Sequence, residues 1–337
     1  MTATVLVTGG AGYIGSHVVA ALARAGSRAV VIDNFANSSP GVLPRLEKLT
    51  GAPVPFVEGD VRDAATLRET FARHPISAVV HCAGMKAVGE SEARPLAYWD
   101  VNVNGTIRLA EVMAEAGVAT MVFSSSATVY GQPERLPVDE QAPLKPASVY
   151  GRTKLTVEDF LRDLARANAN WRIAILRYFN PAGAHPSGLI GESPRGRPNN
   201  LVPFLCRTAA GEFPEVQIFG NDWPTPDGTG VRDYLHVDDL ADGHVAALGH
   251  LARHTGAVTL NLGVGRGFSV LEVVAAFERA CGRPLPKAFV PRRDGDVACV
   301  YADPSRARDL LGWRTTRDLA TICEDAWRWQ RTGGRYD

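Results

Sequence analysis

Two short segments of the chain carry residues that could move a proton. Tyr150 and Lys154 are four residues apart in VYGRTK, and the segment SSSATVY, about twenty residues earlier, carries three serines and Thr128. A tyrosine in water keeps its proton to a pKa of about 10, so it becomes a base at neutral pH only where a nearby positive charge favours the phenolate. Lys154 is the candidate for that charge, and one of the serines can hydrogen-bond a substrate oxygen. The pattern predicts proton transfer to and from an oxygen atom.

The tyrosine and the lysine are predicted to lie on one helix. SVYGRTKLTVEDFLRDLARA has apolar positions three and four residues apart, which is typical of an amphipathic helix. Residues four apart are neighbours on one helix face, so Tyr150 and Lys154 are expected side by side. The alternative is a purely structural pair on a surface helix. For Ser124 and Ser125 we favour an ordinary polar turn that closes the preceding strand.

A glycine-rich turn near the start of the chain predicts a bound dinucleotide. In TVLVTGGAGYIGSH, Gly9, Gly12 and Gly15 follow a predicted strand and open a predicted helix. In such a turn one glycine allows the bend, one lets the backbone approach a pyrophosphate, and one packs the helix against the strand. Asp33 closes the next strand, where a carboxylate accepts hydrogen bonds from a ribose. A phosphate on that ribose would meet the charge of Asp33, so NAD is expected rather than NADP. The alternative is a glycine turn beside a solvent-exposed carboxylate.

Two further strand ends carry candidate cofactor contacts. Asp60 follows the third predicted strand in EGDVRD, and the segment HCAGMK places Cys82, Ala83, Gly84 and Lys86 after the fourth. Ligands of doubly wound sheets bind at the carboxyl ends of the strands. For Asp60 an ordinary helix cap remains the alternative.

The elements that must position these residues alternate along the first half of the chain. Strands are predicted at residues 4–8, 29–33, 54–58, 77–82, 119–124 and 171–179, with helical patterns between them. This alternation predicts an α/β fold with a doubly wound parallel, Rossmann-like sheet. After about residue 180 long loops rich in Gly, Pro, Asn and Ser appear. We therefore expect an NAD-binding domain at residues 1–180 and a smaller α/β substrate-binding lobe at 181–337. The apolar runs at 257–262 and 286–290 are candidates to return to the first sheet.

Composition excludes several other classes of protein. The 337 residues carry 36 Lys and Arg against 36 Asp and Glu, with no basic block, so nucleic acid is not an expected partner. No signal-peptide pattern and no run of roughly 18 apolar residues appears, so no membrane association is expected. The five scattered cysteines suit reduced thiols in the cytoplasm. We expect no metal: His236 with Asp238 and Asp239 is explained by helix capping, and His81 by burial in the core.

Longer segments carry a resemblance to a known family. VLVTGGAGYIGSH, FVEGDVRD, KAVGES, FSSSATVYG, YGRTK, LRYFNPAGAHPSG, PNNLVP, FGNDWPTPDGTGVRDYLHVDDLADGH, NLGVG and PRRDGDV occur in order over nearly the whole chain. They resemble the extended short-chain dehydrogenase/reductase superfamily and, within it, the UDP-glucose 4-epimerase family. The resemblance implies reversible C4 epimerisation of a UDP-hexose through a 4-keto intermediate, with tightly bound NAD. It also implies a homodimer formed by two helices of each subunit, one of them the helix that bears Tyr150.

The resemblance assigns roles to individual residues. Ser126, Tyr150 and Lys154 would be the catalytic trio, with Thr128 in support. In addition to the glycines and the strand ends above, the residues around NAD would be Tyr13, Ile14, Asp33, Asn34, Asn37, Ser38, Asp60, Val61, Lys86, Asn102 and Phe179. The residues around the UDP-sugar would be Asn180, Asn199, Asn200, Leu201, Phe219, Arg232, Arg293, Asp296 and Val300. Within VNVNGT, Asn102 is chosen for the nicotinamide side. Arg232 and Arg293 suit a diphosphate because a guanidinium offers paired donors.

One position bears on sugar specificity. Val300 lies where some members of the family have a tyrosine and others a small residue. A valine leaves room for an N-acetyl group, so UDP-N-acetylglucosamine and UDP-N-acetylgalactosamine are expected as further substrates.

Two competing functions share much of this pattern. Sugar-nucleotide dehydratases and decarboxylases of the superfamily carry acidic residues directly after the catalytic hydroxyl, where this chain has Ala127 and Thr128. A non-enzymatic NAD sensor or scaffold could lose the tyrosine or the lysine, and this chain keeps both. Fold alone cannot decide among these functions, whereas the site residues favour epimerisation.

Overall fold

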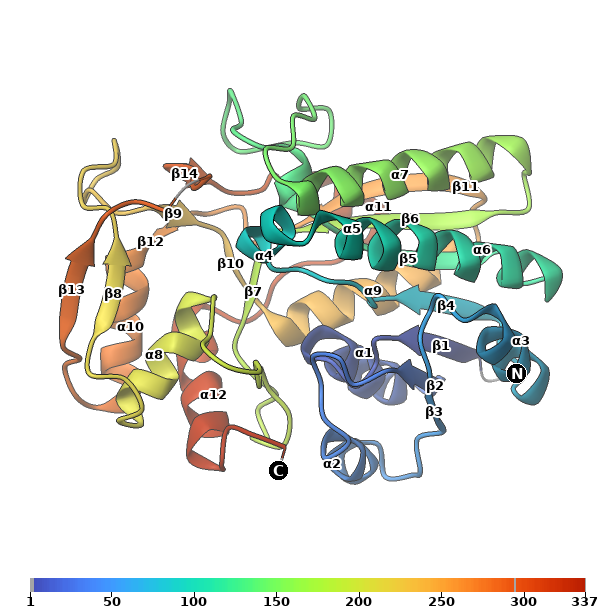
Figure 1. The fold of residues 1–337 in the computed structure, drawn as a ribbon, viewed down its shortest axis with the longest axis horizontal. Helices are drawn as coiled ribbons and strands as arrows, with labels where there is room; N and C mark the ends of the chain where they lie inside the picture. The colour runs from blue at the N-terminus through green and yellow to red at the C-terminus, as the bar shows by residue number, and fades with distance from the viewer. Residues whose placement is uncertain (1–2, 294, 337) are drawn as a thin grey trace.

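A seven-stranded parallel sheet lies at the centre of the larger lobe of the molecule (Figure 1). The computed structural model describes residues 3–293 and 295–336. In spatial order the strands are β3 (Phe56–Glu58), β2 (Arg28–Asp33), β1 (Thr4–Thr8), β4 (Ala78–His81), β5 (Thr120–Ser126), β6 (Arg172–Tyr178) and β11 (Gly256–Leu262). Every neighbouring pair is parallel. The order reverses between β1 and β4, as in a Rossmann fold, so the predicted fold class is confirmed.

Helices cover both faces of this sheet. One face carries α1 (Tyr13–Arg24), α2 (Val42–Thr50), α9 (Val237–Leu251) and α11 (Ser305–Leu311), and the other carries α3 (Ala64–Arg73), α6 (Gly105–Glu115) and α7 (Val149–Ala167). Side chains alternate along the strands: Val5 and Val7 pack under α1 and α9, whereas Leu6 packs under α3 and α6. Because both faces are buried, the centre of β1, Val5 to Val7, is continuously apolar, and this explains why the short strands were recognisable in the sequence.

The second lobe has its own small sheets and core. The sheets comprise β8 (Val216–Phe219) with β13 (Lys287–Val290), β7 (Asn180–Ala182) with β10 (Tyr234–His236), and β12 (Phe268–Ser269), β9 (Val231–Arg232) and β14 (Cys299–Val300). Its helices are α8 (Leu201–Ala209), α10 (Val270–Cys281) and α12 (Leu319–Arg331). Figure 1 shows this lobe beside the carboxyl ends of the large sheet. Leu205, Phe277 and Ile322 lie at the centre of its core.

Short helical turns follow β4 and β5 at the carboxyl edge of the large sheet. After β4 come α4 (Val88–Ala93), α5 (Pro95–Tyr98) and a π-helical turn (Trp99–Asn104) that continues into α6. A single 3-10 turn (Ala127–Val129) follows β5. Tyr98 from α5 packs against Val149 and Tyr150 at the start of α7. These turns therefore hold the first turn of α7 beside the end of β5.

The two apolar runs of the second half form strands in different sheets. The run at 257–262 was predicted correctly: β11 pairs with β6 at the edge of the large sheet. The run at 286–290 was wrongly expected there, because β13 pairs with β8 in the second lobe instead. It directly follows α10, which is anchored in the second core through Phe277, so the short connection keeps the strand in that lobe. The proposed domain boundary near residue 180 stays a prediction.

The sequence predicted neither a membrane association nor a metal site, and the described residues can be compared with both predictions. No helix among them is both long and apolar enough to cross a membrane. Within the same residues no cluster of three or more His, Cys, Asp or Glu side chains could hold a metal ion. His236 caps α9, since its Nδ1 accepts a hydrogen bond from the Asp238 amide at 3.0 Å, and His81 is buried between Thr8 and Thr106.

Candidate active site

Ser126, Tyr150 and Lys154 meet at the carboxyl edge of the large sheet. Ser126 ends β5, and the other two lie one turn apart on α7. The Thr128 hydroxyl donates to Ser126 Oγ at 3.0 Å, and the same serine lies near enough to the Tyr150 phenol to lower its pKa. Lys154 Nζ lies 5.9 Å from the centroid of the Tyr150 ring and donates to the Ser124 carbonyl oxygen at 2.9 Å. The side chains of a proton-transfer site are thus in contact or one helical turn apart.

Burial dominates the protonation of this site. It raises the pKa of Tyr150 to about 12, against the opposing effect of Ser126. It lowers the pKa of Lys154 to about 8. The Lys154 ammonium does not by itself offset this effect of burial, because it lies 5.9 Å from the ring centroid and is directed at the Ser124 carbonyl group. A further positive charge near the phenol is needed to favour the phenolate.

The glycine turn forms a cradle that side chains would fill. A Cβ on Gly9 would lie 2.8 Å from the Ala83 amide nitrogen, and one on Gly15 would lie 2.2 Å from the Gly9 carbonyl oxygen. Gly9 also has a φ of +66°, which glycine adopts readily. Gly12 caps α1 without a side-chain hydrogen bond, so the amides of Tyr13 and Ile14 in the first turn face no capping side chain. Such a turn suits a pyrophosphate at the helix N-terminus.

The loop after β2 is organised around the Asp33 carboxylate. Asp33 accepts hydrogen bonds from the amides of Ala11 and Phe35 and, at 2.7 Å, from the Ser38 hydroxyl. Asn34 donates to Asp60 at 2.8 Å. Asn37 lies in the same loop, so the structure brings the candidate ribose contacts together.

Asp60 and Val61 lie next to this loop, after β3. The Asp60 carboxylate also binds the Arg62 guanidinium at 2.8 Å, and this hydrogen bond lowers the pKa of Asp60 to about 2. Val61 is buried and would contact a Cβ placed on Gly105 at 2.9 Å. The acid therefore stays charged at neutral pH beside the candidate adenosine region.

The segment after β4 is held by Asn102. Its side-chain amide accepts from the Met85 amide at 2.8 Å and donates to the Met85 carbonyl oxygen at 3.1 Å and to Thr153. A Cβ on Gly84 would lie 3.0 Å from Asn102 Oδ1 and 3.6 Å from Lys154 Nζ. Asn102 thus positions the backbone from Cys82 to Gly84 at the trio. The structure shows this positioning contact and leaves the direct nicotinamide contact a prediction.

A charged cluster spans the two lobes beside the glycine turn. Lys86 Nζ lies 3.1 Å from Glu192 Oε1, and the Asn200 amide donates to the same oxygen at 2.8 Å. Glu192 was not among the sequence-predicted residues, because nothing in GESPRG distinguishes it from a loop glutamate. Asn200 caps α8, whose first residue is Leu201.

The candidate diphosphate residues lie together in the second lobe. Arg293 stacks on the Phe219 ring at 3.7 Å from its centroid and donates to the Asn199 carbonyl oxygen at 3.4 Å. Arg232 NH2 lies 3.5 Å from Asp296 Oδ1. The backbone amide of Asn180, at the start of β7, donates to the Asp233 carbonyl oxygen beside Arg232 at 3.0 Å. Two guanidinium groups on neighbouring strands and loops can receive an anionic group.

Val300 links the second lobe to the trio. It pairs with Arg232 across β9 and β14 and contacts the apolar cluster that contains Val129 and Phe179. Phe179 lies in that cluster, whereas the preceding residue, Tyr178, is buried beside Ser124 and Cys82.

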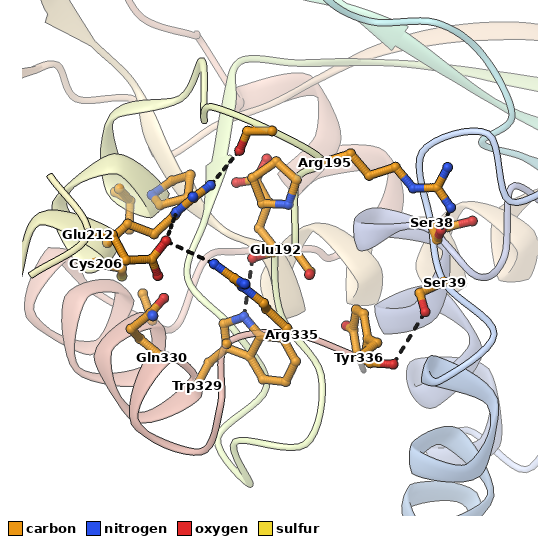
Figure 2. Close-up of a pocket in the computed structure, with 18 of the residues that line it drawn as sticks. Ser38, Ser39, Glu192, Arg195, Cys206, Glu212, Trp329, Gln330, Arg335 and Tyr336 are labelled. Atoms are coloured by element: carbon orange, nitrogen blue, oxygen red, sulfur yellow. Dashed lines mark hydrogen bonds and ion pairs between the residues drawn. The ribbon is translucent and has the colours of Figure 1, made fainter. Parts of the chain in front are cut away.

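A cavity of about 440 Å³ lies on the outer side of the loop after β2 (Figure 2). Ser38, Ser39, Glu192, Arg195 and Tyr336 contribute to its walls. The residues of the trio are not among those that line it, so the cavity is separate from the proton-transfer site.

Comparisons with known proteins agree with this geometry. Residues 5–263 match the NAD dependent epimerase/dehydratase family. The UDP-glucose 4-epimerase of Neisseria meningitidis serogroup A is 54% identical over 326 residues, which are 96% of this chain and 96% of that protein.

Solved structures give the same result. The structure of UDP-glucose 4-epimerase from Bifidobacterium longum in complex with NAD+ and UDP is 49% identical, with a TM-score of 0.95, over 98% of this chain and 99% of that one. The UDP-glucose-4-epimerase of Stenotrophomonas maltophila with bound NAD and formylated UDP-arabinopyranose is 50% identical, with a TM-score of 0.97, over 98% and 99%. Sequence and structure together place the chain in the NAD dependent epimerase/dehydratase family.

Proposed function

We propose that the chain catalyses the reversible C4 epimerisation of UDP-glucose and UDP-galactose, with NAD as a retained cofactor. The observation that carries this proposal is its identity of over one half, across nearly the full length, to a protein named UDP-glucose 4-epimerase. The Ser126, Tyr150 and Lys154 cluster supports it with side chains suited to proton transfer at a hydroxyl group.

The chain's residues fit NAD. The glycine cradle has no room for a Cβ at Gly9 or Gly15, which suits close approach of a pyrophosphate, and Asp33 would accept from the adenosine ribose. Tyr13, Ile14, Asn34, Asn37, Ser38 and Lys86 would complete the contacts. When bound, NAD supplies the hydride acceptor and donor for C4 together with a positively charged ring.

Tyr150 is proposed to exchange the proton of the C4 hydroxyl group. Ser126 lies beside the phenol and would contact the same sugar oxygen, while Thr128 orients the serine through its 3.0 Å hydrogen bond. Lys154, with its pKa of about 8, is largely protonated at pH 7 and would stabilise the phenolate. Removal of the proton and of the C4 hydride leaves a 4-keto sugar.

Inversion requires the UDP to be held while the hexose turns. Arg232 and Arg293 are proposed to bind the diphosphate, Phe219 to flank the uracil, and Asp296 to accept from its ribose. Asn180, Asn199, Asn200 and Leu201 would line the same region. A firmly bound diphosphate would let the keto sugar swing about its bond to the phosphate and present its other face to the cofactor site.

The proposal is tested with purified protein and UDP-galactose, without added NAD. We expect UDP-glucose to appear until the two sugars reach equilibrium, with no net oxidation, and the product is resolved by chromatography. Formation of a 4-keto-6-deoxy sugar instead would assign the site to a dehydratase. Absence of any C4 epimer even with NAD supplied would refute the proposal for these sugars.

We further propose that the valine at position 300 admits N-acetylated sugars. Val300 contacts the cluster around Phe179 and Val129, so a larger side chain there would project toward the region next to the trio. Val300→Tyr should reduce turnover of UDP-N-acetylgalactosamine relative to UDP-galactose by roughly tenfold or more. The matched variant Val300→Ala should leave the ratio of the two turnovers close to that of the unmodified chain. An unchanged ratio in Val300→Tyr would argue against this assignment.

Assembly as a homodimer in the cytoplasm is also proposed. Val88, Leu96 and Trp99 are exposed apolar residues on the elements that pack beside α7, and Leu96 is 85% exposed. A second copy covering this surface would bury them, in line with an interface that includes the Tyr150 helix. The five cysteines are free, which suits a reducing compartment.

A further inference from the structure

The loop that carries the candidate ribose contacts is held from outside by the second lobe. Residues 34–41 follow Asp33 and lead into α2. Arg195 donates to the carbonyl oxygens of Ala36 and Ser38, at 3.3 and 2.9 Å. The Ser39 hydroxyl donates to the Tyr336 carbonyl oxygen at 3.3 Å. Figure 2 shows both contacts reaching the loop across the cavity.

Segment 329–336, which ends α12 and continues past it, joins this loop to the second lobe. The Tyr336 hydroxyl donates to the Gly191 carbonyl oxygen at 2.9 Å and accepts from the Gly191 amide at 3.0 Å. The Trp329 indole donates to the Glu192 carbonyl oxygen at 3.2 Å. Both aromatic side chains thus hydrogen-bond the backbone of residues 191–192. The Glu192 side chain contacts Lys86 of the first lobe.

Arg45 of α2 completes the attachment from the first lobe. Its guanidinium lies 5.1 Å from the centroid of the Tyr336 ring and 5.2 Å from that of Trp329. It also donates to the Arg335 carbonyl oxygen at 2.7 Å. Gly41 permits this approach, because a Cβ there would lie only 1.8 Å from the Tyr336 carbonyl oxygen. The first lobe therefore meets the segment at a few specific contacts.

We infer that segment 329–336 is a tether that controls how long NAD stays bound. The inference rests on the proposed function, in which the same cofactor must accept and return a hydride. The Ser38 hydroxyl donates to Asp33, and the hydroxyl of the neighbouring Ser39 donates to the Tyr336 carbonyl oxygen. The loop can therefore open only if its contact with the tether breaks. Apart from the two Arg195 hydrogen bonds, the outer side of the loop faces the cavity. Gly41 and Tyr336 are thus positioning residues for the cofactor.

Gly41→Ala is the sharpest test of the tether. Gly41 has φ −61° and ψ −11°, so alanine is tolerated by the backbone and only the Tyr336 carbonyl group must move. Free nucleotide is removed from the purified full chain, and exchange of the retained NAD is followed after addition of excess fluorescent etheno-NAD. We expect exchange to accelerate roughly tenfold or more, as loss of one or two hydrogen bonds predicts. The NAD concentration for half-maximal turnover should rise, while turnover at saturating NAD stays within about threefold of the unmodified chain.

Two further variants keep the result interpretable. Gly249→Ala changes an exposed glycine of α9 whose added Cβ meets nothing within 4 Å, and it should not alter exchange. Tyr336→Phe keeps the ring beneath Arg45 but removes both hydrogen bonds to Gly191, and it serves if Gly41→Ala does not fold. Exchange within twofold of the unmodified chain in the folded variants would overturn the tether. If the unmodified chain retains no NAD at all, the proposed cofactor role fails instead.

Discussion

Tyr150→Phe is expected to lower turnover of UDP-galactose by roughly 10²- to 10⁴-fold, the usual contribution of a positioned acid–base group. The substitution removes only the hydroxyl group, which lies near Ser126. The ring keeps its contacts with Tyr98 and Val149, so the fold and the glycine cradle should be preserved. Initial rates of UDP-glucose formation, measured with the melting temperature and the amount of retained NAD, separate loss of chemistry from loss of structure.

Tyr98→Phe is the matched control for that experiment. Tyr98 belongs to the same apolar cluster, but its hydroxyl donates to the Ala87 carbonyl oxygen at 2.7 Å and to Glu90, away from Ser126. We expect this variant to lose some stability and to keep turnover within a few-fold of the unmodified chain. A Tyr150→Phe protein that retained more than about a tenth of the activity would mean that another group exchanges the proton.

Much of the fold was predictable because its signals are local. The strands from β1 to β6 are short apolar runs separated by helical periodicity, and all of them formed close to their predicted bounds. The exception was the run at 286–290: its hydrophobicity indicated a strand but not its partner, which is decided by the anchoring of α10. Pairing between distant segments is a tertiary property, and a single sequence carries little information about it.

The same division applies to the site. Tyr150, Lys154 and the glycines of the cradle could be predicted from the sequence, because the spacing between them is fixed within one helix or one turn. Glu192, Arg195 and Tyr336 were not, because Arg195 and Tyr336 meet the loop after β2, and Glu192 meets Lys86, only after the two lobes associate. The protonation of Tyr150 likewise depends on more than spacing. The spacing indicates a nearby ammonium, whereas burial, which depends on the whole fold, raises the pKa of the phenol in the chain without a cofactor.

A buried ion pair supports the edge of the sheet on which the trio lies. Arg177 of β6 and Glu158 of α7 are 2.5 Å apart and almost fully buried. Glu158 also accepts from the Ser125 hydroxyl at 2.5 Å, and Arg177 donates to the Tyr130 hydroxyl at 2.9 Å. Glu158 lies one turn beyond Lys154, so the pair joins α7 to β5 and β6 directly behind the proton-transfer site.

Arg177→Met should destabilise the fold by about 3–5 kcal/mol at pH 7, because the buried Glu158 carboxylate then keeps only Ser125 and the partly exposed Arg162 as partners. Denaturant unfolding followed by tryptophan fluorescence measures the change. Arg166→Met is the matched control, since Arg166 pairs with Asp163 on the exposed side of the same helix and should contribute little. A loss below about 1 kcal/mol in Arg177→Met would show that the pair is not required for stability.

The pH dependence distinguishes an uncompensated charge from lost packing. Burial acts to raise the pKa of Glu158, but Arg177, Ser125 and Arg162 overcome this effect and hold it below its usual value of 4.5. In the unmodified chain this contribution to stability is present above pH 4.5 and is lost as the pH falls through the lower folded pKa. Without Arg177, burial should prevail and raise the folded pKa of Glu158 above its unfolded value, which penalises folding at neutral pH.

The penalty in Arg177→Met should therefore shrink as the pH falls from about 7 to 5, because the folded state takes up the proton that neutralises Glu158. The double variant Glu158→Gln with Arg177→Met removes the stranded charge and should be more stable at pH 7 than Arg177→Met alone. If the loss were instead the same at both pH values and the double variant no more stable, the cost would lie in packing around Tyr130 rather than in charge. The stability of the catalytic edge would then depend on shape, and its acid–base residues could be studied without regard to the pair behind them.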